Sequence, residues 1–481
     1  MSWIKNNQNI ENKHSGSVHK FFKIVTWFFL LVSLLMLAYV YYRAEIVFQG
    51  ALYNKFIKYY AVSIIAIVSF ALILRIGHKT RANIVLIIIS FAVGIYLMEA
   101  SIYFFEKRSF VSEVDRLKIA ASKQEIEFDS RTKIQVIHDM RNNGKDVFPQ
   151  IHPSYILARS NLDGIFPLGG LSNRTTIGSN EGEGYMIFQT DRYGFNNPDY
   201  EWDSKYTDYM LVGDSFTQGV AVQQGKDIAG QIRRTTGSSV INLGKSGNGP
   251  LIELAALKEY AEIKKPKKTI WIYFEGNDLD YDLRREKFNA LLMNYLEQDF
   301  TQGLIQRQTQ IDNVLLKYIA NEEKYFVSKI NDDISKKMEI MTSLLKLSHI
   351  RKTIHADNYA EDSLQLFKHI IKQAKIRVSK WGGELYFVYL PDNRRYTSLV
   401  TDGDTYKERR KVFSMISKLG IPIIDIHDDV FSKHPDIPSL FPLRVTSNHY
   451  NAEGYNEVAK AIVAGVKKYE NQNTPENPIS R

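Results

Sequence analysis

The first 105 residues are far more apolar than the rest of the chain, and they contain three long hydrophobic runs. The runs cover about 22–42, 59–77 and 82–105, and each is near the ~20 residues that a helix needs to cross a bilayer. None has the polar face of a surface helix, so three buried helices of a soluble core are the weaker interpretation. No small-residue cleavage site follows the first run, which argues against a signal peptide. We predict a membrane anchor at residues 1–105 with three transmembrane helices.

Basic side chains gather on two short flanks of these spans. They precede the first span and fill the turn between the second and third: Lys5, Lys13, Lys20, Lys23, Arg75, Lys79 and Arg81. By the positive-inside rule both flanks are cytoplasmic, although the loop between the first two spans also carries basic residues. Three spans then place the chain after Phe105 on the outer side of the membrane. We expect a bacterial inner-membrane protein whose C-terminal domain is periplasmic or extracellular, with the lipid bilayer as one partner.

Beyond residue 206 the pattern changes, and short apolar runs alternate with amphipathic segments. The runs predict strands at Tyr209–Gly213, Val240–Leu243, Thr269–Phe274, Leu385–Leu390 and Pro422–Ile426. The segments between and after them predict helices at about Asp227–Thr236, Leu251–Ile263, Glu361–Lys380, Tyr406–Leu419 and Ala452–Tyr469. Short apolar strands that alternate with helices are typical of a parallel sheet covered on both faces. We therefore predict one α/β domain over residues 206–470.

Three further segments do not fit this alternation. Residues 284–358 are more than a βα connection needs, and their helical spacing predicts an inserted subdomain that caps the site, binds a partner or packs on the sheet. Residues 106–205 predict a lead-in region: a charged helical stalk over 109–143, a connector, and a strand with a polar, aromatic turn over 185–197. That last segment could line a substrate cleft or pack on the sheet as a hairpin. Residues 471–481 predict a disordered tail.

Composition narrows the chemistry. The 481 residues include no cysteine, which excludes disulfides, thiolate metal sites and a cysteine nucleophile. The formal net charge is +9, but the basic residues flank the spans and decorate helices, and no block resembles a nucleic-acid motif. We expect no nucleic-acid partner.

Four polar blocks follow the predicted strands in order. They are Gly213-Asp214-Ser215, Asn242 to Pro250, Glu275 to Asp278, and Ser447 to Gly454. Each falls at the carboxyl end of a strand or at the start of a helix, so a parallel sheet brings all four to one edge. Each block is common by itself, but the order and regular placement of the set predict one site.

The blocks supply the parts of an acyl-transfer site. Ser215 is a candidate nucleophile, and His449 is a candidate base because its neutral imidazole can accept a proton at pH 7. Negative charge on the reacting carbonyl oxygen needs hydrogen-bond donors. The backbone N–H groups of Ser215 and Gly247 and the side-chain amide of Asn277 could provide three. We expect Asp214 to be structural, bonding backbone groups around its turn.

These blocks resemble those of the SGNH, or GDSL-type, hydrolase superfamily, which is named for Ser, Gly, Asn and His in that order. The matching positions are Ser215, Gly247, Asn277 and His449, and the resemblance covers about residues 209–468, interrupted by the insertion. It implies a flavodoxin-like three-layer α/β/α fold, a serine nucleophile, and esterase, lipase, deacetylase or O-acyltransferase activity. It also implies that no metal and no organic cofactor takes part.

One position departs from the family pattern. The family usually has an aspartate three residues before the histidine, which orients the imidazole, and here Thr446 stands there. The acid could come from elsewhere, for example Asp425, Asp428 or Asp429. Alternatively, a backbone carbonyl could orient a Ser–His dyad, or the site could be catalytically weakened.

A small group of acidic residues and histidines near residue 430 could suggest a metal site. Its members are Asp425, His427, Asp428, Asp429 and His434. Their close spacing in a loop favours a solvated turn, and we expect no metal there.

Three functions fit these observations. The first is a membrane-anchored serine esterase or deacylase that acts on acyl esters of cell-envelope glycans or lipids at the outer face of the membrane. The second is an O-acyltransferase that modifies a surface polysaccharide and receives its acyl group from a membrane partner protein. The third is a non-catalytic module in polysaccharide export or assembly, with the insertion as its partner surface.

Overall fold

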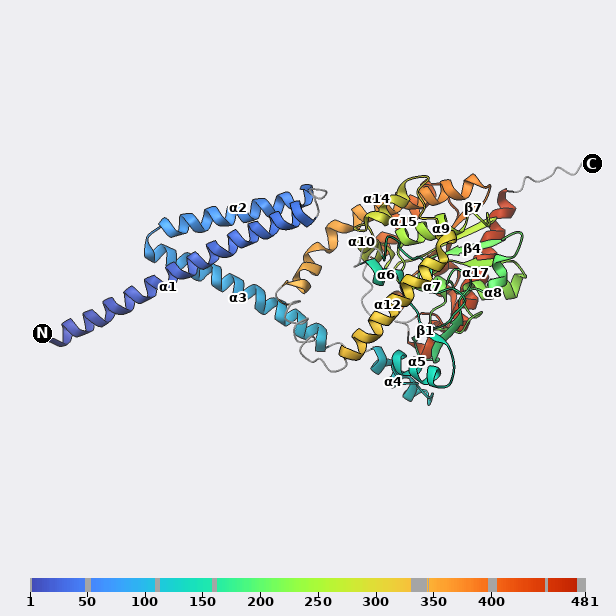
Figure 1. The fold of residues 1–481 in the computed structure, drawn as a ribbon, viewed down its shortest axis with the longest axis horizontal. Coiled ribbons are helices and arrows are strands. Elements are labelled where there is room, and N and C mark those ends of the chain that lie inside the picture. The colour runs from blue at the N-terminus through green and yellow to red at the C-terminus, as the bar shows by residue number, and fades with distance from the viewer. Residues whose placement is uncertain are drawn as a thin grey trace, which may run out of the picture. The chain divides into compact units, whose positions relative to one another are not determined.

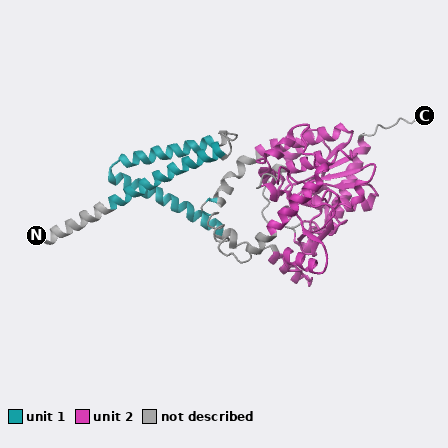
Figure 2. Cartoon of the chain, viewed as in Figure 1, with its two compact units in different colours: residues 1–109, 336–353 teal, residues 110–335, 354–481 magenta. Residues whose placement is uncertain are grey.

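The computed structural model describes residues 2–47, 53–108, 113–157, 162–329, 344, 346–396, 405–445 and 449–473. The chain divides into two compact units, shown in Figure 2. The first comprises residues 1–109 with 336–353, and the second comprises residues 110–335 with 354–481.

The first unit contains the three predicted spans, which are confirmed as long apolar helices. They are α1 (Ser2–Tyr41), continued by the π-helical turn η1 (Tyr42–Val47), then α2 (Tyr53–Arg75) and α3 (His78–Arg108). Windows at Val18–Ile46, Phe56–Arg75 and His78–Tyr103 are long and apolar enough to cross a membrane. Large apolar side chains along all three helices are exposed, as a lipid-facing surface requires, among them Leu35, Ile65 and Phe91.

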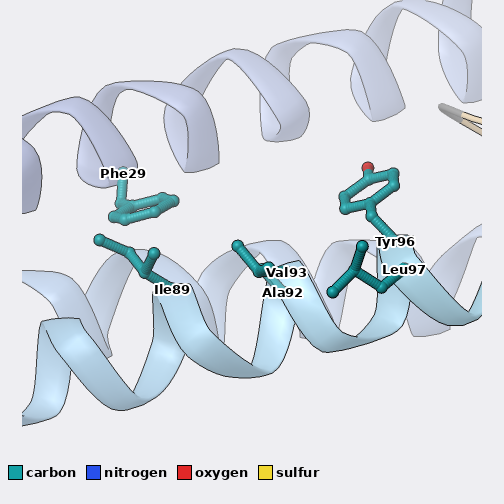
Figure 3. A pocket seen from close by; sticks show the side chains of 6 residues that line it. All are labelled: Phe29, Ile89, Ala92, Val93, Tyr96 and Leu97. Carbon is teal, nitrogen blue, oxygen red and sulfur yellow. The ribbon is translucent and has the colours of Figure 1, made fainter.

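Hydroxyl groups inside these helices bond to the helix itself. Thr26, Ser33 and Ser63 each donate to the carbonyl oxygen four residues earlier, at 2.7 to 2.8 Å, so no hydroxyl hydrogen of these three needs water inside a bilayer. Between α1 and α3 lies an apolar hollow of about 360 Å³ (Figure 3). It is lined by Phe29, Ile89, Ala92, Val93, Tyr96 and Leu97.

The second unit is built on a five-stranded parallel sheet (Figure 1). Its strands are β4 (Tyr209–Val212), β5 (Val240–Asn242), β6 (Lys268–Phe274), β7 (Glu384–Leu390) and β8 (Ile423–Asp425). They lie side by side in the order β5-β4-β6-β7-β8 with every pair parallel, which is the flavodoxin-like order 2-1-3-4-5. The predicted strands and fold class are confirmed, and the predicted bounds differ by only one residue at some strand ends.

Alternate residues of these strands enter two separate hydrophobic cores. From β6, Trp271 and Tyr273 join the core on one face, and Ile270 and Ile272 join the core on the other. The first face is covered by α9 (Pro250–Tyr260), α12 (Gln308–Lys329), α14 (Ser348–Lys380) and α15 (Thr405–Lys418). The second face is covered by α8 (Ile228–Thr236) and α17 (Ala452–Asn473). Since burial of each large apolar side chain contributes about 1.5–3 kcal/mol, the two cores fix the sheet firmly.

The described part of the predicted insertion, residues 284–329, packs on the first face of the sheet. It contains α10 (Leu283–Glu286), α11 (Ala290–Met293), two 3₁₀ turns, η5 (Asn294–Leu296) and η6 (Leu304–Arg307), and then α12. Its apolar residues, including Tyr295, Leu304 and Leu315, are buried in the same core as α9. Ile340, Met341 and Leu345, on which part of the helical prediction rested, lie outside the described residues. The predicted helix at 361–380 begins earlier, at Ser348, so it includes the end of the insertion.

The lead-in region differs from the prediction. The stalk is two helices, α4 (Glu113–Lys123) and α5 (Lys133–Asn142), because Thr132 and Gln135 form a capping box that starts α5 afresh. The connector contains the short helix α6 (Pro153–Ile156), with proline at its first position. A second sheet follows the order β1-β2-β3, from β1 (Val147–Pro149), β2 (Thr175–Asn180) and β3 (Tyr185–Gln189). β1 and β2 are parallel, and β2 and β3 form an antiparallel hairpin.

At the end of the chain, α17 continues through Asn473, so residues 471–473 of the predicted tail are helical. Residues 474–481 lie outside the described residues. The domain boundaries drawn from the sequence stay predictions.

Candidate active site

Ser215 stands at the carboxyl end of β4, as its block predicts. It is the first residue of the short helix α7 (Ser215–Gln218). Asp214 caps this helix by accepting a hydrogen bond from the Phe216 N–H at 2.9 Å, and its Oδ2 lies 3.3 Å from Ser215 Oγ. The strand end and the capped turn together hold the Ser215 hydroxyl in a defined position.

His449 contacts Ser215 directly. Its Nε2 lies 2.8 Å from Ser215 Oγ, and its Nδ1 lies 2.7 Å from Glu181 Oε1. The backbone N–H of His449 also donates to Glu181 Oε2 at 2.8 Å. An ionised carboxylate can only accept, so Nδ1 carries the proton toward Glu181 and Nε2 is free to accept the proton of Ser215. Serine, histidine and a carboxylate therefore form a continuous chain of hydrogen bonds.

Glu181 is held in its ionised form. Burial by itself would raise the pKa of this carboxyl, whose side chain is 8% exposed. The charge of His449 and the two hydrogen bonds from it outweigh burial, and the pKa is lowered from its ordinary value. A carboxylate that stays negative beside Nδ1 both orients the imidazole and stabilises its protonated form.

The turn that carries Glu181 connects β2 and β3 and is tightly fixed. Asn180 Nδ2 donates to the Asp129 carbonyl at 3.0 Å, and the Gly182 N–H donates to Asn180 Oδ1 at 2.9 Å. Gly182 has φ +125°, and a Cβ there would lie 2.6 Å from Leu443 Cδ1. Both the backbone angle and the close packing require glycine at this position.

The stalk helix α4 packs beside the same turn. Its Leu117 and Ala121 form a small core with Leu443, and Gln124 Nε2 donates to the Leu443 carbonyl at 2.7 Å. The lead-in region thus contacts the segment that precedes His449 as well as carrying Glu181.

Asn277 follows β6 and lies beside Asp214. Its side chain contributes a hydrogen bond to the Asp214 carboxylate, while its Oδ1 is buried without a protein partner. Burial raises the pKa of Asp214 despite the opposing charge of His449 and its hydrogen bonds. Burial also raises the pKa of neighbouring Asp278 and Glu253 well above the ordinary value, and repulsion between the carboxylates of this group adds to it. The pKa values of the carboxyl groups around Asp214 are therefore raised by burial and by one another.

Gly247 lies on the loop after β5, and this loop is fastened to α7. The Ser246 N–H donates to Gln218 Oε1 at 2.8 Å, and Gln150 Nε2 donates to the same oxygen at 2.7 Å. Gly247 has φ +75°, and a Cβ there would overlap Ser154 Oγ. The structure thus joins Ser215 and His449 directly, places Asn277 beside Asp214, and connects the Gly247 loop to α7 through Ser246.

The aspartates considered as the orienting acid have other partners. Asp425 accepts from the His427 N–H at 3.1 Å and forms an ion pair with Arg409, and Asp428 pairs with Arg409 at 3.0 Å. Glu181 instead occupies Nδ1, the atom that an orienting acid must reach. Thr446 lies outside the described residues.

Glu181 gave little signal in the sequence. It lies 268 residues before His449, in a Glu- and Gly-rich turn that matches no motif. The one hint in the sequence is that this carboxylate comes just before the 185–197 segment, which is a candidate wall of a substrate cleft. Within the described ranges, no group of three or more His, Asp or Glu side chains is placed to hold a metal ion.

Comparisons with known proteins return solved structures alone. No family model matches, and no curated protein matches. A lipase/acylhydrolase from Enterococcus faecalis is 14% identical, with 55% of this chain and 96% of that chain covered and a TM-score of 0.31. A putative lipolytic protein of the G-D-S-L family from Desulfitobacterium hafniense DCB-2 is 12% identical, with 54% and 99% covered and a TM-score of 0.31. The acetyl xylan esterase AlAXEase is 13% identical, with 54% and 99% covered and a TM-score of 0.30.

Identities and TM-scores this low carry no information about substrate. The order of the parallel strands and the position of each polar block along them come from this chain itself. By that strand order, and with helices on both faces of the sheet, the second unit has a flavodoxin-like three-layer α/β/α fold.

Proposed function

We propose that this protein is a membrane-anchored serine esterase or deacylase that cleaves acyl esters at the outer face of the membrane. The observation that carries the proposal is the unbroken contact of Ser215 Oγ with His449 Nε2 and of His449 Nδ1 with Glu181. A serine alone at a strand end has no activated oxygen, whereas this arrangement provides a base and a group that orients the base.

In the proposed reaction His449 Nε2 takes the hydroxyl proton as Ser215 Oγ attacks the carbonyl carbon of the ester. The Oγ–C bond forms, and the bond between that carbon and the leaving alcohol breaks. His449 returns the proton to the oxygen of the alcohol. A water molecule then attacks the carbonyl carbon of the acyl-enzyme and gives a proton to His449. The bond between that carbon and Ser215 Oγ breaks, His449 returns the proton to Oγ, and the carboxylic acid leaves. Throughout, Glu181 balances the charge on the imidazolium.

Three donors would stabilise the negative oxygen of each tetrahedral intermediate. The Ser215 N–H lies at the first position of α7 and has no acceptor within that helix. The Gly247 N–H comes from the loop fastened to α7, and the place of a side chain there is taken by Ser154. The amide nitrogen of Asn277 has two hydrogens, so it can bond to Asp214 and to the oxyanion at once.

The membrane anchor supports the proposed location. Three apolar helices tether the chain, and the basic flanks at residues 5–23 and 75–81 favour an orientation with the catalytic domain outside the cytoplasm. Acyl esters of envelope glycans or lipids are the substrates available to an enzyme held there.

Replacement of the nucleophile tests the proposal. The full-length Ser215→Ala variant, purified in detergent, should lose turnover of p-nitrophenyl acetate and labelling by a fluorophosphonate probe. Ser432→Ala is the matched control, since Ser432 is a serine whose hydroxyl donates to the Asp428 carbonyl within its own turn. Equal turnover by Ser215→Ala and by the wild type would refute the proposal.

A second candidate uses the same residues for transfer. The hydroxyl of a surface polysaccharide would replace water in the second half of the reaction, and a membrane partner would supply the acyl group. The observation that favours it is the triple-span anchor, because hydrolysis alone does not require a fixed position beside a membrane donor. Analysis of envelope glycans from a deletion strain separates the two, since loss of a transferase removes acyl groups and loss of an esterase increases them.

A further inference from the structure

A group of aromatic and basic residues, most of them exposed, adjoins the Gly247 loop. We call it the rim, and it consists of His152, Tyr155, Tyr281 and Arg285. The His152 and Tyr155 rings stack with centroids 4.6 Å apart and planes 13° apart. Tyr155 is 53% exposed and Tyr281 is 60% exposed. Two flat aromatic side chains are therefore open to solvent in the part of the chain that borders the proposed oxyanion donors.

A series of contacts connects the rim to Gly247. A Cβ on Gly247 would overlap Ser154 Oγ and lie 3.7 Å from His152 Cβ, so His152 and Ser154 form the wall beside Gly247. Arg285 Nη2 donates to the Ser154 carbonyl at 3.3 Å, and its guanidinium lies 5.1 Å from the centre of the Tyr281 ring. The rim thus begins beside Gly247 and continues outward from it.

The charge of the rim is positive. Burial lowers the pKa of His152 to about 3, with help from the charges of Lys133 and Lys245, so this imidazole is neutral and can both donate and accept a hydrogen bond. Arg285 contributes a positively charged guanidinium. Its carboxyl neighbour Asp282, 3.9 Å away, has a pKa raised to about 8 by burial and by the nearby carboxylates Glu286 and Asp214. At neutral pH Asp282 therefore holds its proton for most of the time and does not cancel the positive charge of Arg285.

We propose that the rim binds the sugar rings of an acidic glycan, and that this glycan is the substrate on which the proposed acyl chemistry acts. A sugar ring has one face of C–H groups, which packs on an exposed aromatic ring. The hydroxyl groups at its edge exchange hydrogen bonds with groups such as His152 and Arg285. Carboxylate or other anionic substituents complement the guanidinium of Arg285. The inference rests on the proposed function, since it names the substrate class of the same site.

Binding to an oligosaccharide tests the inference without turnover. The full chain with Ser215→Ala, in detergent micelles, is titrated with hexagalacturonate and with mannohexaose, and the dissociation constant is measured by calorimetry. Added Tyr155→Ala or Tyr281→Ala should weaken hexagalacturonate binding about tenfold each, the loss expected for one stacked ring. Mannohexaose should bind more weakly than hexagalacturonate, and added salt should reduce the difference.

Tyr206→Ala is the matched control. Tyr206 is 64% exposed and has Lys205 Nζ at 5.1 Å from its ring centre, which repeats the surroundings of Tyr281. It precedes β4, however, whereas Ser215 follows β4. Binding unchanged in Tyr206→Ala and weakened in the two rim variants supports the inference. Absence of binding by either oligosaccharide, or equal binding in all variants, overturns it.

Contact of the rim with the lipid surface is the competing outcome. The chain has no cysteine, so Tyr155→Cys can carry a single environment-sensitive fluorophore. After reconstitution into phosphatidylethanolamine–phosphatidylglycerol vesicles, a blue shift of the label that hexagalacturonate does not reverse would assign the rim to lipid and overturn the inference. If Ser215 proves dispensable for turnover but the rim variants still lose binding, the proposed function fails and the binding site stands. If turnover requires Ser215 but no oligosaccharide binds, the proposed function stands and the glycan-binding inference fails.

Discussion

The two sheets of the second unit contribute to the same site but differ in how they are built. The five-stranded parallel sheet is buried on both faces, and its strands are short runs of apolar residues such as β4, Tyr-Met-Leu-Val. The three-stranded sheet is small and partly exposed, and β2 is the polar run Thr-Thr-Ile-Gly-Ser-Asn. The large sheet places Ser215 and Asn277, and the small sheet places Glu181.

The two sheets have different roles in the candidate site. The large sheet provides the rigid edge on which a nucleophile and its oxyanion donors can be aligned, because two cores hold it from both sides. The small sheet contributes a single carboxylate on a fixed turn, which requires little core. A segment that resembles a linker in the sequence can therefore complete an active site.

The largest effect on the contrast between the two sheets should come from removing the Glu181 carboxylate, which the small sheet contributes. Glu181→Gln should lower kcat for p-nitrophenyl acetate by roughly 10²–10⁴-fold, because a neutral amide no longer stabilises the imidazolium. Glu183→Gln is the control, a glutamate two positions along the same turn, and it should retain turnover. The same rates for both variants would mean that the small sheet has no part in catalysis.

The next test acts on the turn rather than on the carboxylate. Gly182→Ala must adopt φ +125° and pack against Leu443 Cδ1, so it should cost about 1–3 kcal/mol of stability and reduce kcat by displacing Glu181. Gly184→Ala also has a positive φ, of +91°, but a Cβ there meets nothing within 4 Å. It should cost about 1 kcal/mol and leave kcat nearly intact. The unfolding midpoint reports backbone strain in each variant, and kcat reports displacement of Glu181. A Gly182→Ala variant with wild-type kcat would contradict the expectation.

A substitution in the large sheet should affect stability alone. Asp425 ends β8, caps α16 (Ile426–Asp429) and pairs with Arg409. Asp425→Asn should therefore lower the free energy of unfolding by about 1–2 kcal/mol while kcat stays at the wild-type value. A fall in kcat as large as that of Glu181→Gln would instead restore Asp425 as the orienting acid.

The smallest expected effect concerns pH. The pKa of Asp282 is raised to about 8 in the folded protein, so the folded state keeps a proton that the unfolded state releases near pH 4. The stabilisation from that proton is complete below about pH 4 and is lost as pH rises toward 8. Asp282→Asn has no proton to lose, so its melting temperature should improve relative to the wild type between pH 5 and pH 8. The exposed neighbour variant Asp280→Asn should show a constant difference, and a constant difference for Asp282→Asn would show that the carboxyl is ionised.

Sequence patterns predicted the large sheet well because burial on both faces leaves apolar runs that little else explains. Once those strands were located, the blocks after them placed Ser215 and Asn277 at one edge. β1 and β2 have no such runs, so the pattern predicts neither strand. The charged 109–143 segment predicts one helical stalk, although the capping box at Thr132 divides it. Glu181 could not be found because its partner, His449, comes from the opposite end of the chain, and the pairing depends on the tertiary contacts of Asn180, Gly182 and Leu443.

The separation of Glu181 and His449 by 268 residues also determines when the protein can first act. A ribosome delivers the anchor, the lead-in region and Ser215 long before it delivers His449, and N-terminal parts of a chain fold first during synthesis. Ser215 has no base, and Glu181 has no imidazole to orient, until the segment that carries His449 has emerged and folded against them. We expect every nascent or prematurely terminated chain that lacks His449 to be inert toward esters.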